Sequence, residues 1–231
     1  MENRETFLAE IARKLGRTVR YTPEQMPEPV NTLAATRLTE LTMQQRCEAF
    51  IQFASEVMLA HCTLVSPDDA PTAALDLCRK YGSGPVIISD DQRLVETGIT
   101  PLLIKECGAA LWDPELGEKN IHLAEKAKTG VVFAEYGLTE SGGVVLFSAP
   151  GRGRSVSLLP EASVFVLRKS SILPRVAQLA QKLHEMAQQG QRMPSCINLI
   201  GGPSSTADIE LIKVVGVHGP MHAAYLIIDD C

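Results

Sequence analysis

The sequence predicts an α/β fold in which a mostly parallel, Rossmann-like sheet is covered by helices on both faces. From Cys62 onward, short apolar runs such as residues 85–89 and 130–134 alternate with helical patterns. Continuous apolar strands separated by helices are typical of parallel sheets that are buried on both faces. Before Cys62 the apolar residues recur at helical spacing. We therefore expect an N-terminal helical arm over residues 1–61 and an α/β domain over residues 62–231.

The expected arm contains two helices joined by an extended segment. Phe7, Leu8, Ile11 and Leu15 recur at helical spacing and predict a helix over residues 3–15. Residues 17–36 include three prolines and little periodicity, which favours an extended chain. The apolar positions that follow predict one long helix over residues 37–61.

The α/β domain is expected to alternate strands and helices. Predicted strands cover residues 63–65, 85–89, 109–112, 130–134, 142–147, 163–167, 196–200 and 223–228, and predicted helices cover 71–80, 100–107, 121–128 and 171–188. The strand at 142–147 follows its predecessor after only a short link. Because a parallel connection needs a longer crossover, we expect antiparallel pairing there.

Composition excludes several classes of protein. The chain has 231 residues, a net charge of −5 and no basic, aromatic-rich segment, so nucleic-acid binding is not expected. No apolar run reaches the roughly 20 residues that a membrane span needs. The N-terminus lacks the apolar core of a signal peptide, which predicts a cytoplasmic protein.

The six cysteines are not spaced for metal binding. No two form a C-x-x-C pair, and no histidine lies at zinc-finger spacing from them. Iron–sulfur clusters normally use closely spaced cysteines. We therefore expect no metal and no cluster in this chain, and we interpret most of the thiols as small core residues.

A candidate anion site follows the strand at residues 196–200. Two glycines break the strand, and Ser205 with Asp208 fits the spacing of a capping box, so we expect a helix to begin there. Free N–H groups and the positive end of a helix attract anions. The candidate ligand-binding residues are Gly201, Gly202, Ser204, Ser205 and Thr206. The alternative is a turn whose hydroxyls only cap the helix.

Glu135 and Glu140 lie in a glycine-rich segment between two apolar strands. Ligands of parallel α/β sheets gather at the carboxyl ends of strands, so these carboxylates are candidates for a general base or for a group that orients a substrate. The alternative is a turn with solvated carboxylates. We expect Glu135 and the 201–206 loop to lie at the same edge of the sheet.

Arg154 and His218 complete the candidate residues. Arg154 lies in Gly-Arg-Gly-Arg-Ser, which lacks the spacing of a phosphate-binding loop, and it is either part of a surface loop or a partner for a carboxylate. His218 lies on a turn and is a candidate proton donor or a turn-capping residue. Gly219 and Pro220 separate it from His222 and forbid the helix that a metal pair would need.

Four blocks of sequence together resemble the lactate utilization protein C family of small LUD-domain proteins. The blocks are residues 135–142, 157–160, 202–210 and 216–220. The resemblance implies a fold of the NagB/RpiA/CoA-transferase type. It also implies a role in oxidising L-lactate to pyruvate within a three-protein system, in which the two companions carry the iron–sulfur motifs. It assigns no catalytic residue.

We therefore expect a component of an iron–sulfur lactate-oxidising system that has no cofactor of its own. It would bind a small carboxylate, dock onto the cluster-bearing partners, or do both. One rival hypothesis is a stand-alone enzyme acting on a phosphorylated or CoA-linked small molecule, because fold alone does not fix function. A second rival is a scaffold or assembly protein without a ligand.

Overall fold

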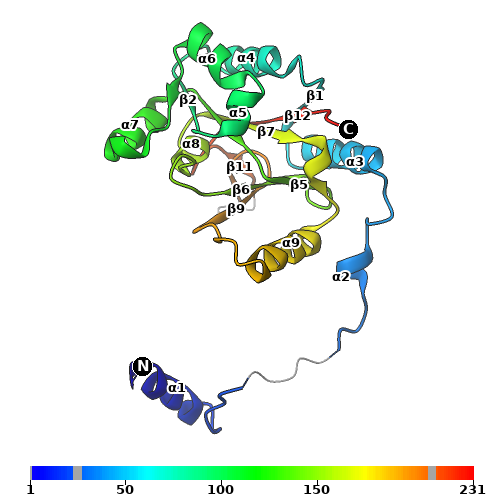
Figure 1. The fold of residues 1–231 in the computed structure, drawn as a ribbon, viewed down its shortest axis with the longest axis vertical. Helices are drawn as coiled ribbons and strands as arrows, with labels where there is room; N and C mark the ends of the chain where they lie inside the picture. The colour runs from blue at the N-terminus through cyan, green and yellow to red at the C-terminus, as the bar shows by residue number, and fades with distance from the viewer. Residues whose placement is uncertain (1, 23–27, 208–211) are drawn as a thin grey trace. The chain divides into compact units, whose positions relative to one another are not determined.

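The computed structural model describes residues 2–22, 28–207 and 212–231 (Figure 1). Its contacts divide the chain into two compact units, Met1–Thr32 and Leu33–Cys231. The first unit contains helix α1 (Glu2–Lys14), which confirms the helix predicted there. The boundary that the sequence suggests after residue 61 stays a prediction about domains.

Within the described residues, six parallel strands form the central sheet of the second unit. In spatial order they are β1 (His61–Val65), β12 (His222–Ile228), β7 (Ala162–Arg168), β4 (Thr129–Phe133), β2 (Val86–Ile88) and β3 (Ala110–Leu111). Strand register places Thr129, Ala162 and His222 side by side at the amino edge. The predicted parallel α/β architecture is confirmed.

A second, mixed sheet packs against the first. Its order is β8 (Ile172–Leu173), β5 (Tyr136–Leu138), β6 (Gly143–Phe147) and β9 (Ile197–Ile200). Strand β6 is antiparallel to both β5 and β9, which confirms the antiparallel pairing predicted for it. The expected partner, the strand at residues 130–134, is wrong, because β6 pairs with the intervening β5 and not with β4.

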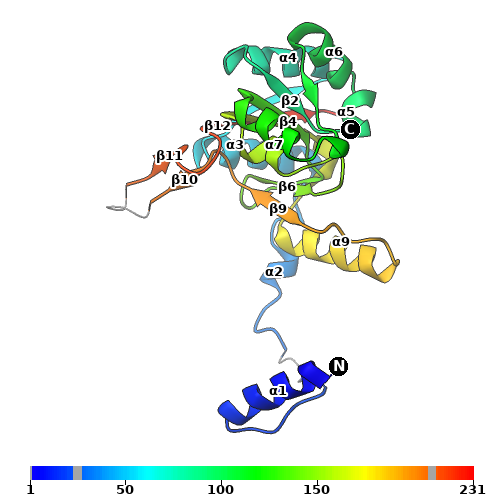
Figure 2. The same ribbon diagram turned by 90° about the vertical axis from the view of Figure 1, so that its left-hand side faces the viewer.

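Helices cover both sheets in layers, as Figures 1 and 2 show. One face of the central sheet packs against α4 (Ala70–Lys80), α5 (Gln92–Glu96) and α6 (Ile99–Cys107). The other face packs against the second sheet, α3 (Met43–Glu56), α7 (Glu118–Lys126) and α8 (Ser155–Leu158). Helix α9 (Val176–Gln188) covers the outer face of the second sheet. The connections between these elements include short helical turns, namely α2 (Leu33–Thr36), η1 (Pro114–Leu116) and η2 (Lys169–Ser171).

The helix predicted over residues 37–61 is present but shorter at both ends. Helix α3 covers Met43–Glu56, α2 ends before residue 37, and β1 already begins at His61. Thr42 and Gln45 form a capping box: the Thr42 hydroxyl accepts from the Gln45 N–H at 3.2 Å, and the Gln45 side chain accepts from the Thr42 N–H at 3.0 Å. This box starts a new helix, and its buried Phe50 packs in the core of the second unit.

The helix predicted to start at Ser205 is also not formed there. Ser205 and Thr206 are β10 (Ser205–Thr206), which pairs antiparallel with β11 (Val214–Val215). The partner strand β11 supplies hydrogen bonds that a helix would otherwise provide. Strand pairing therefore prevails over the tendency of Ser205 to cap a helix. Asp208, the other half of the expected capping box, lies outside the described residues.

At Gly202 the loop after β9 packs closely against the residues that follow α3. Its φ is +70°, and a Cβ there would lie 2.0 Å from the Met58 carbonyl oxygen. Gly190 has a similar φ of +67°, yet an added Cβ would meet nothing within 4 Å.

We expect Gly190→Ala to lower the free energy of unfolding by about 1 kcal/mol through its left-handed backbone alone. We expect Gly202→Ala to cost about 3 kcal/mol or more, because the Met58 carbonyl must also move. Urea unfolding of both variants measures the difference, and equal losses would contradict this packing.

Candidate functional site

Arg93 joins two loops at the carboxyl edge of the central sheet. Asp91 follows β2, Glu135 follows β4, and Arg93 lies on α5. The Arg93 Nε and Nη2 atoms donate to the two Asp91 oxygens at 2.9 and 2.7 Å. Its Nη1 and Nη2 atoms donate to the two Glu135 oxygens at 2.7 and 2.9 Å. One guanidinium therefore binds two carboxylates, each through both of its oxygens.

Arg152 completes this network from the loop after β6. Its Nη1 donates to Glu135 Oε1 and lies 3.7 Å from Asp91 Oδ2. The loop is held in place because the Asp90 N–H donates to the Gly151 carbonyl at 2.8 Å. We call Asp91, Arg93, Glu135 and Arg152 the edge network.

Burial and charge pairing fix the protonation of the edge network. Asp91 is only 6% exposed, and the Arg93 guanidinium lies 4.5 Å from the centre of the Phe133 ring. Burial alone would raise the pKa of Asp91, but the hydrogen bonds and charge of Arg93 lower it below its ordinary value. Burial alone would lower the pKa of Arg93, but its hydrogen bonds to Asp91 and Glu135 raise it. Both groups therefore stay charged at neutral pH.

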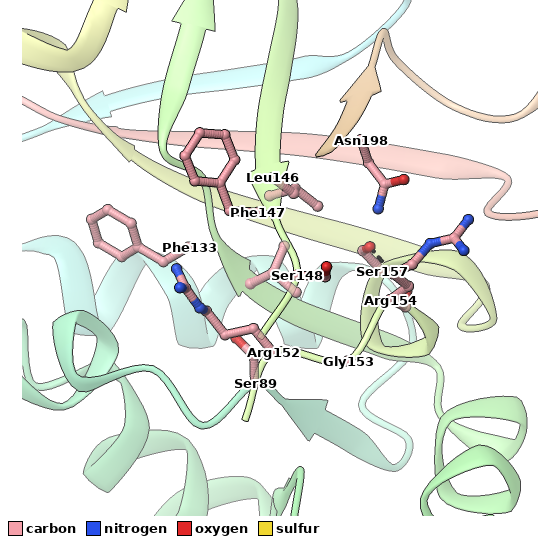
Figure 3. Close-up of a pocket in the computed structure, with 11 residues that line it drawn as sticks. Ser89, Phe133, Leu146, Phe147, Ser148, Arg152, Gly153, Arg154, Ser157 and Asn198 are labelled. Atoms are coloured by element: carbon pink, nitrogen blue, oxygen red, sulfur yellow. Dashed lines mark hydrogen bonds between the residues drawn. The ribbon is translucent and has the colours of Figure 1, made fainter. Parts of the chain in front are cut away.

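The edge network adjoins a narrow pocket between the sheets (Figure 3). Arg152 extends toward Phe133 on one side, while Arg154 lies beside Asn198 on the other. Within the described residues the Ser89 hydroxyl, almost fully buried, has no hydrogen-bond partner and lines this pocket. Arg154 is exposed and Arg152 is the arginine that pairs with Glu135, while the predicted role of Arg154 as a partner for the carboxylate of a ligand stays a prediction.

A larger pocket of about 350 Å³, which we call the amino-edge pocket, lies where β7 and β12 begin. Three of the four sequence blocks line it. The lining residues are Ser157, Leu158, Ser163, Phe165, Leu199, Ile200, Gly201, Gly202, Pro203, Ser204, Ser205, His218, Pro220 and Ala223. Among the residues that the structure describes, none of those lining the pocket is Asp, Glu, Lys or Arg.

The backbone groups predicted to bind an anion in this pocket are partly engaged already. The Gly202 N–H donates to the Tyr225 hydroxyl oxygen at 2.8 Å, and the Ser204 N–H donates to the Pro220 carbonyl at 2.9 Å. Within the described part of the chain, the side chains of Ser204, Ser205 and His218 carry no hydrogen bond. The pocket thus offers hydroxyls and an imidazole, while its anion-binding role stays a prediction.

The expectation that Glu135 and the 201–206 loop share one sheet edge is wrong. Glu135 follows the carboxyl end of β4. Strand β9 belongs to the second sheet and runs antiparallel to β6, so its end at Ile200 reaches the amino edge, beside Ser163 and Ala223. The candidate residues therefore form two separate sites and not one.

Glu140 belongs to neither site. Its two carboxylate oxygens accept from Arg175 Nε at 2.6 Å and from the Val176 N–H at 2.7 Å, at the start of α9. Burial alone would raise the pKa of Glu140, but the Val176 N–H and Arg175 lower it. A carboxylate at a helix N-terminus stabilises the helix, so the contacts of Glu140 are those of a cap.

Metal ligands and thiolates offer no further site in the described ranges. Among residues 2–22, 28–207 and 212–231, no group of three or more His, Cys, Asp or Glu side chains is placed to hold a metal ion. Burial raises the pKa of the Cys47 thiol to about 11 and that of Cys78 to about 12. In the same ranges no helix is long and apolar enough to span a bilayer.

Comparison with known proteins identifies similar chains over the full length. The LUD domain matches residues 48–228. The chain is 64% identical over 231 residues to the "Uncharacterized protein YkgG" of Escherichia coli, covering 100% of both. It is 38% identical to the "Lactate utilization protein C" of Geobacillus kaustophilus and 39% identical to that of Bacillus subtilis, covering 100% of this chain and 98% of each relative.

A solved structure supports the fold. The crystal structure of a duf162 family protein from Deinococcus radiodurans superposes with a TM-score of 0.53 at 16% identity, covering 81% of this chain and 99% of that one. Likeness at this level of identity concerns the fold alone.

The lowered pKa of Asp91 predicts how stability depends on pH. A carboxyl whose pKa is lower in the folded state stabilises the protein above its ordinary pKa, here 3.8, and this contribution is lost as the pH falls through the folded-state value. We expect Asp91→Asn to lower stability by about 2 kcal/mol near neutral pH and to weaken the loss seen on acidification. Urea unfolding between about pH 3 and about pH 6 measures both effects. Parallel pH profiles for the two proteins would contradict the assigned ion pairing.

Proposed function

The chain belongs to the LUD-domain family, and from this premise we propose that it serves lactate utilization as a subunit that docks onto iron–sulfur partner proteins. The proposed system oxidises L-lactate to pyruvate in the cytoplasm. In this proposal the clusters belong to the partners, and this chain holds none.

Two kinds of observation support a lactate role. Relatives that bear the name lactate utilization protein C align with this chain from end to end. The assignment of clusters to companion proteins comes from the resemblance of the four sequence blocks. The scattered cysteines agree with that division, since clusters are normally bound by closely spaced cysteines.

The observation that carries the docking proposal is the character of the amino-edge pocket. Its described lining contains no Asp, Glu, Lys or Arg, and exposed apolar side chains lie around it. Leu199 lines the pocket and is 53% exposed, while Val217 and Met221 flank His218 and Pro220 and are 53% and 44% exposed. Apolar groups gathered on a surface around a pocket are typical of protein interfaces, where an anchor residue of the partner enters the pocket.

The hairpin of β10 and β11 adds to this surface. Figure 2 shows it extending from the body of the second unit, directly after the loop that lines the pocket. Val214 and Val215 of β11 are both exposed. Burying these side chains against a partner would stabilise the complex, since each buried apolar side chain contributes roughly 1.5–3 kcal/mol. We therefore assign the partner-binding face to this hairpin and the amino-edge pocket.

Charged substitutions on this face test the proposal. We expect Leu199→Glu combined with Val217→Glu to abolish growth on L-lactate of a strain that lacks the native gene. We also expect recovery of the co-expressed iron–sulfur lactate utilization proteins to fall about tenfold or more. Ile104→Glu is the matched control: it is an exposed apolar residue, 44% exposed, on α6 at the opposite face of the central sheet.

Two results would contradict the proposal. Normal growth of the deletion strain on L-lactate would remove the lactate role. Unchanged growth and unchanged partner recovery in the double variant, with thermal stability like that of Ile104→Glu, would remove docking through this face.

A further inference from the structure

A pocket of about 280 Å³ lies at the carboxyl ends of β4 and β7. Phe133 is the last residue of β4 and Arg168 the last residue of β7, and Lys182 of α9 joins them in lining the pocket. Ligands of parallel α/β sheets bind at this edge, where loops leave the strand ends. The pocket therefore lies where a ligand site is expected in such a fold.

Two cations in this pocket have no anionic partner among the described residues. Within the described residues, no Asp or Glu oxygen lies within 4.0 Å of the charged nitrogens of Arg168 or Lys182. Lys182 Nζ instead lies 5.9 Å from the centre of the Tyr136 ring. Glu185, one turn further along α9, accepts a hydrogen bond from Gln181 at 3.0 Å.

Glu135 lines the same pocket but does not neutralise these cations. Its Oε1 accepts from Arg93 and Arg152, and its Oε2 accepts from Arg93 at 2.7 Å. Both oxygens are therefore engaged within the edge network, whose two arginines balance its two carboxylates. Among the described lining residues, Arg168 and Lys182 are therefore left without an ion pair, although the chain as a whole carries −5. Unpaired cations that line a pocket attract an anion.

The remaining lining indicates the size and shape of that anion. Leu173 and Phe133 supply apolar surface. Among the described contacts the Tyr136 hydroxyl makes no hydrogen bond, so it is able to donate one to a second oxygen of a ligand. A small acid with a short apolar group and one additional oxygen satisfies all these features.

We propose that this pocket binds a small carboxylate with an oxygen on the adjacent carbon, a 2-hydroxy or 2-oxo acid. Arg168 and Lys182 bind the carboxylate, and the Tyr136 hydroxyl binds the adjacent oxygen. The edge network holds Arg93 and Glu135 in place as one wall. The preference for an anion follows from charge, whereas the choice of this acid class rests on the proposed lactate function.

Calorimetric titration of the purified full-length chain tests the site. The probes are L-lactate, pyruvate, propionate (which lacks the second oxygen) and inorganic phosphate. We expect L-lactate or pyruvate to bind more tightly than propionate and phosphate, and added salt to weaken binding. We expect Arg168→Gln and Lys182→Gln each to weaken binding about tenfold, since each removes a charge-assisted hydrogen bond. Lys126→Gln, an exposed cation on α7, is the matched control.

Absence of binding by the wild-type chain at millimolar concentrations of both acids would overturn the proposal, and so would equal affinity in all three variants. Tighter binding of phosphate than of either acid would overturn the assigned ligand class. Growth of the deletion strain on L-lactate is scored separately. If the chain is required for growth but binds neither acid, only this inference fails. If the chain binds the acid but is dispensable for growth, the proposed function fails.

Discussion

The guanidinium of Arg93 is the group on which the charged edge of this protein depends. It binds Asp91 and Glu135 through both oxygens of each carboxylate and lies over the Phe133 ring, so the loops after β2 and β4 are joined by one side chain. Arg152 brings in the loop after β6. Because the oxygens of Glu135 are engaged in this network, Arg168 and Lys182 form no ion pair within the described part of the chain. The same contacts that order the loops thus adjoin the pocket that we propose binds an anion.

The two pockets at opposite ends of the central strands differ in their lining. The inner residues of β7 and β12 are buried, which leaves only the strand ends for polar or binding groups. At the carboxyl edge those groups include arginines and carboxylates. At the amino edge the Lys128–Glu161 ion pair precedes β4 and β7, while the described lining of the amino-edge pocket consists of hydroxyls, His218 and apolar side chains such as Leu199. The site proposed for a small ligand and the face proposed for a protein partner therefore lie on different surfaces of the chain.

The sequence indicates the strands well, because β4, β7 and β12 are continuous apolar runs whose burial needs no knowledge of their neighbours. It does not indicate that β9 runs antiparallel beside β6, since strand direction depends on pairing between distant segments, so the sequence alone places the candidate residues at one edge. Arg93 and Glu135 are 42 residues apart, so their contact has no local signal. The capping box of Thr42 and Gln45, in contrast, is local and predicts that the helix begins at Met43 and not at residue 37.

We propose that this chain is a working component of an iron–sulfur lactate-oxidising system. The decisive measurement is reconstitution of L-lactate oxidation from the purified cluster-bearing partners, with and without the full-length chain. We expect pyruvate formation with an added electron acceptor to need the chain, or to rise steeply with it until the chain matches the partners in amount. A rate that stays the same whether or not the chain is present would show that the chain is not a working component.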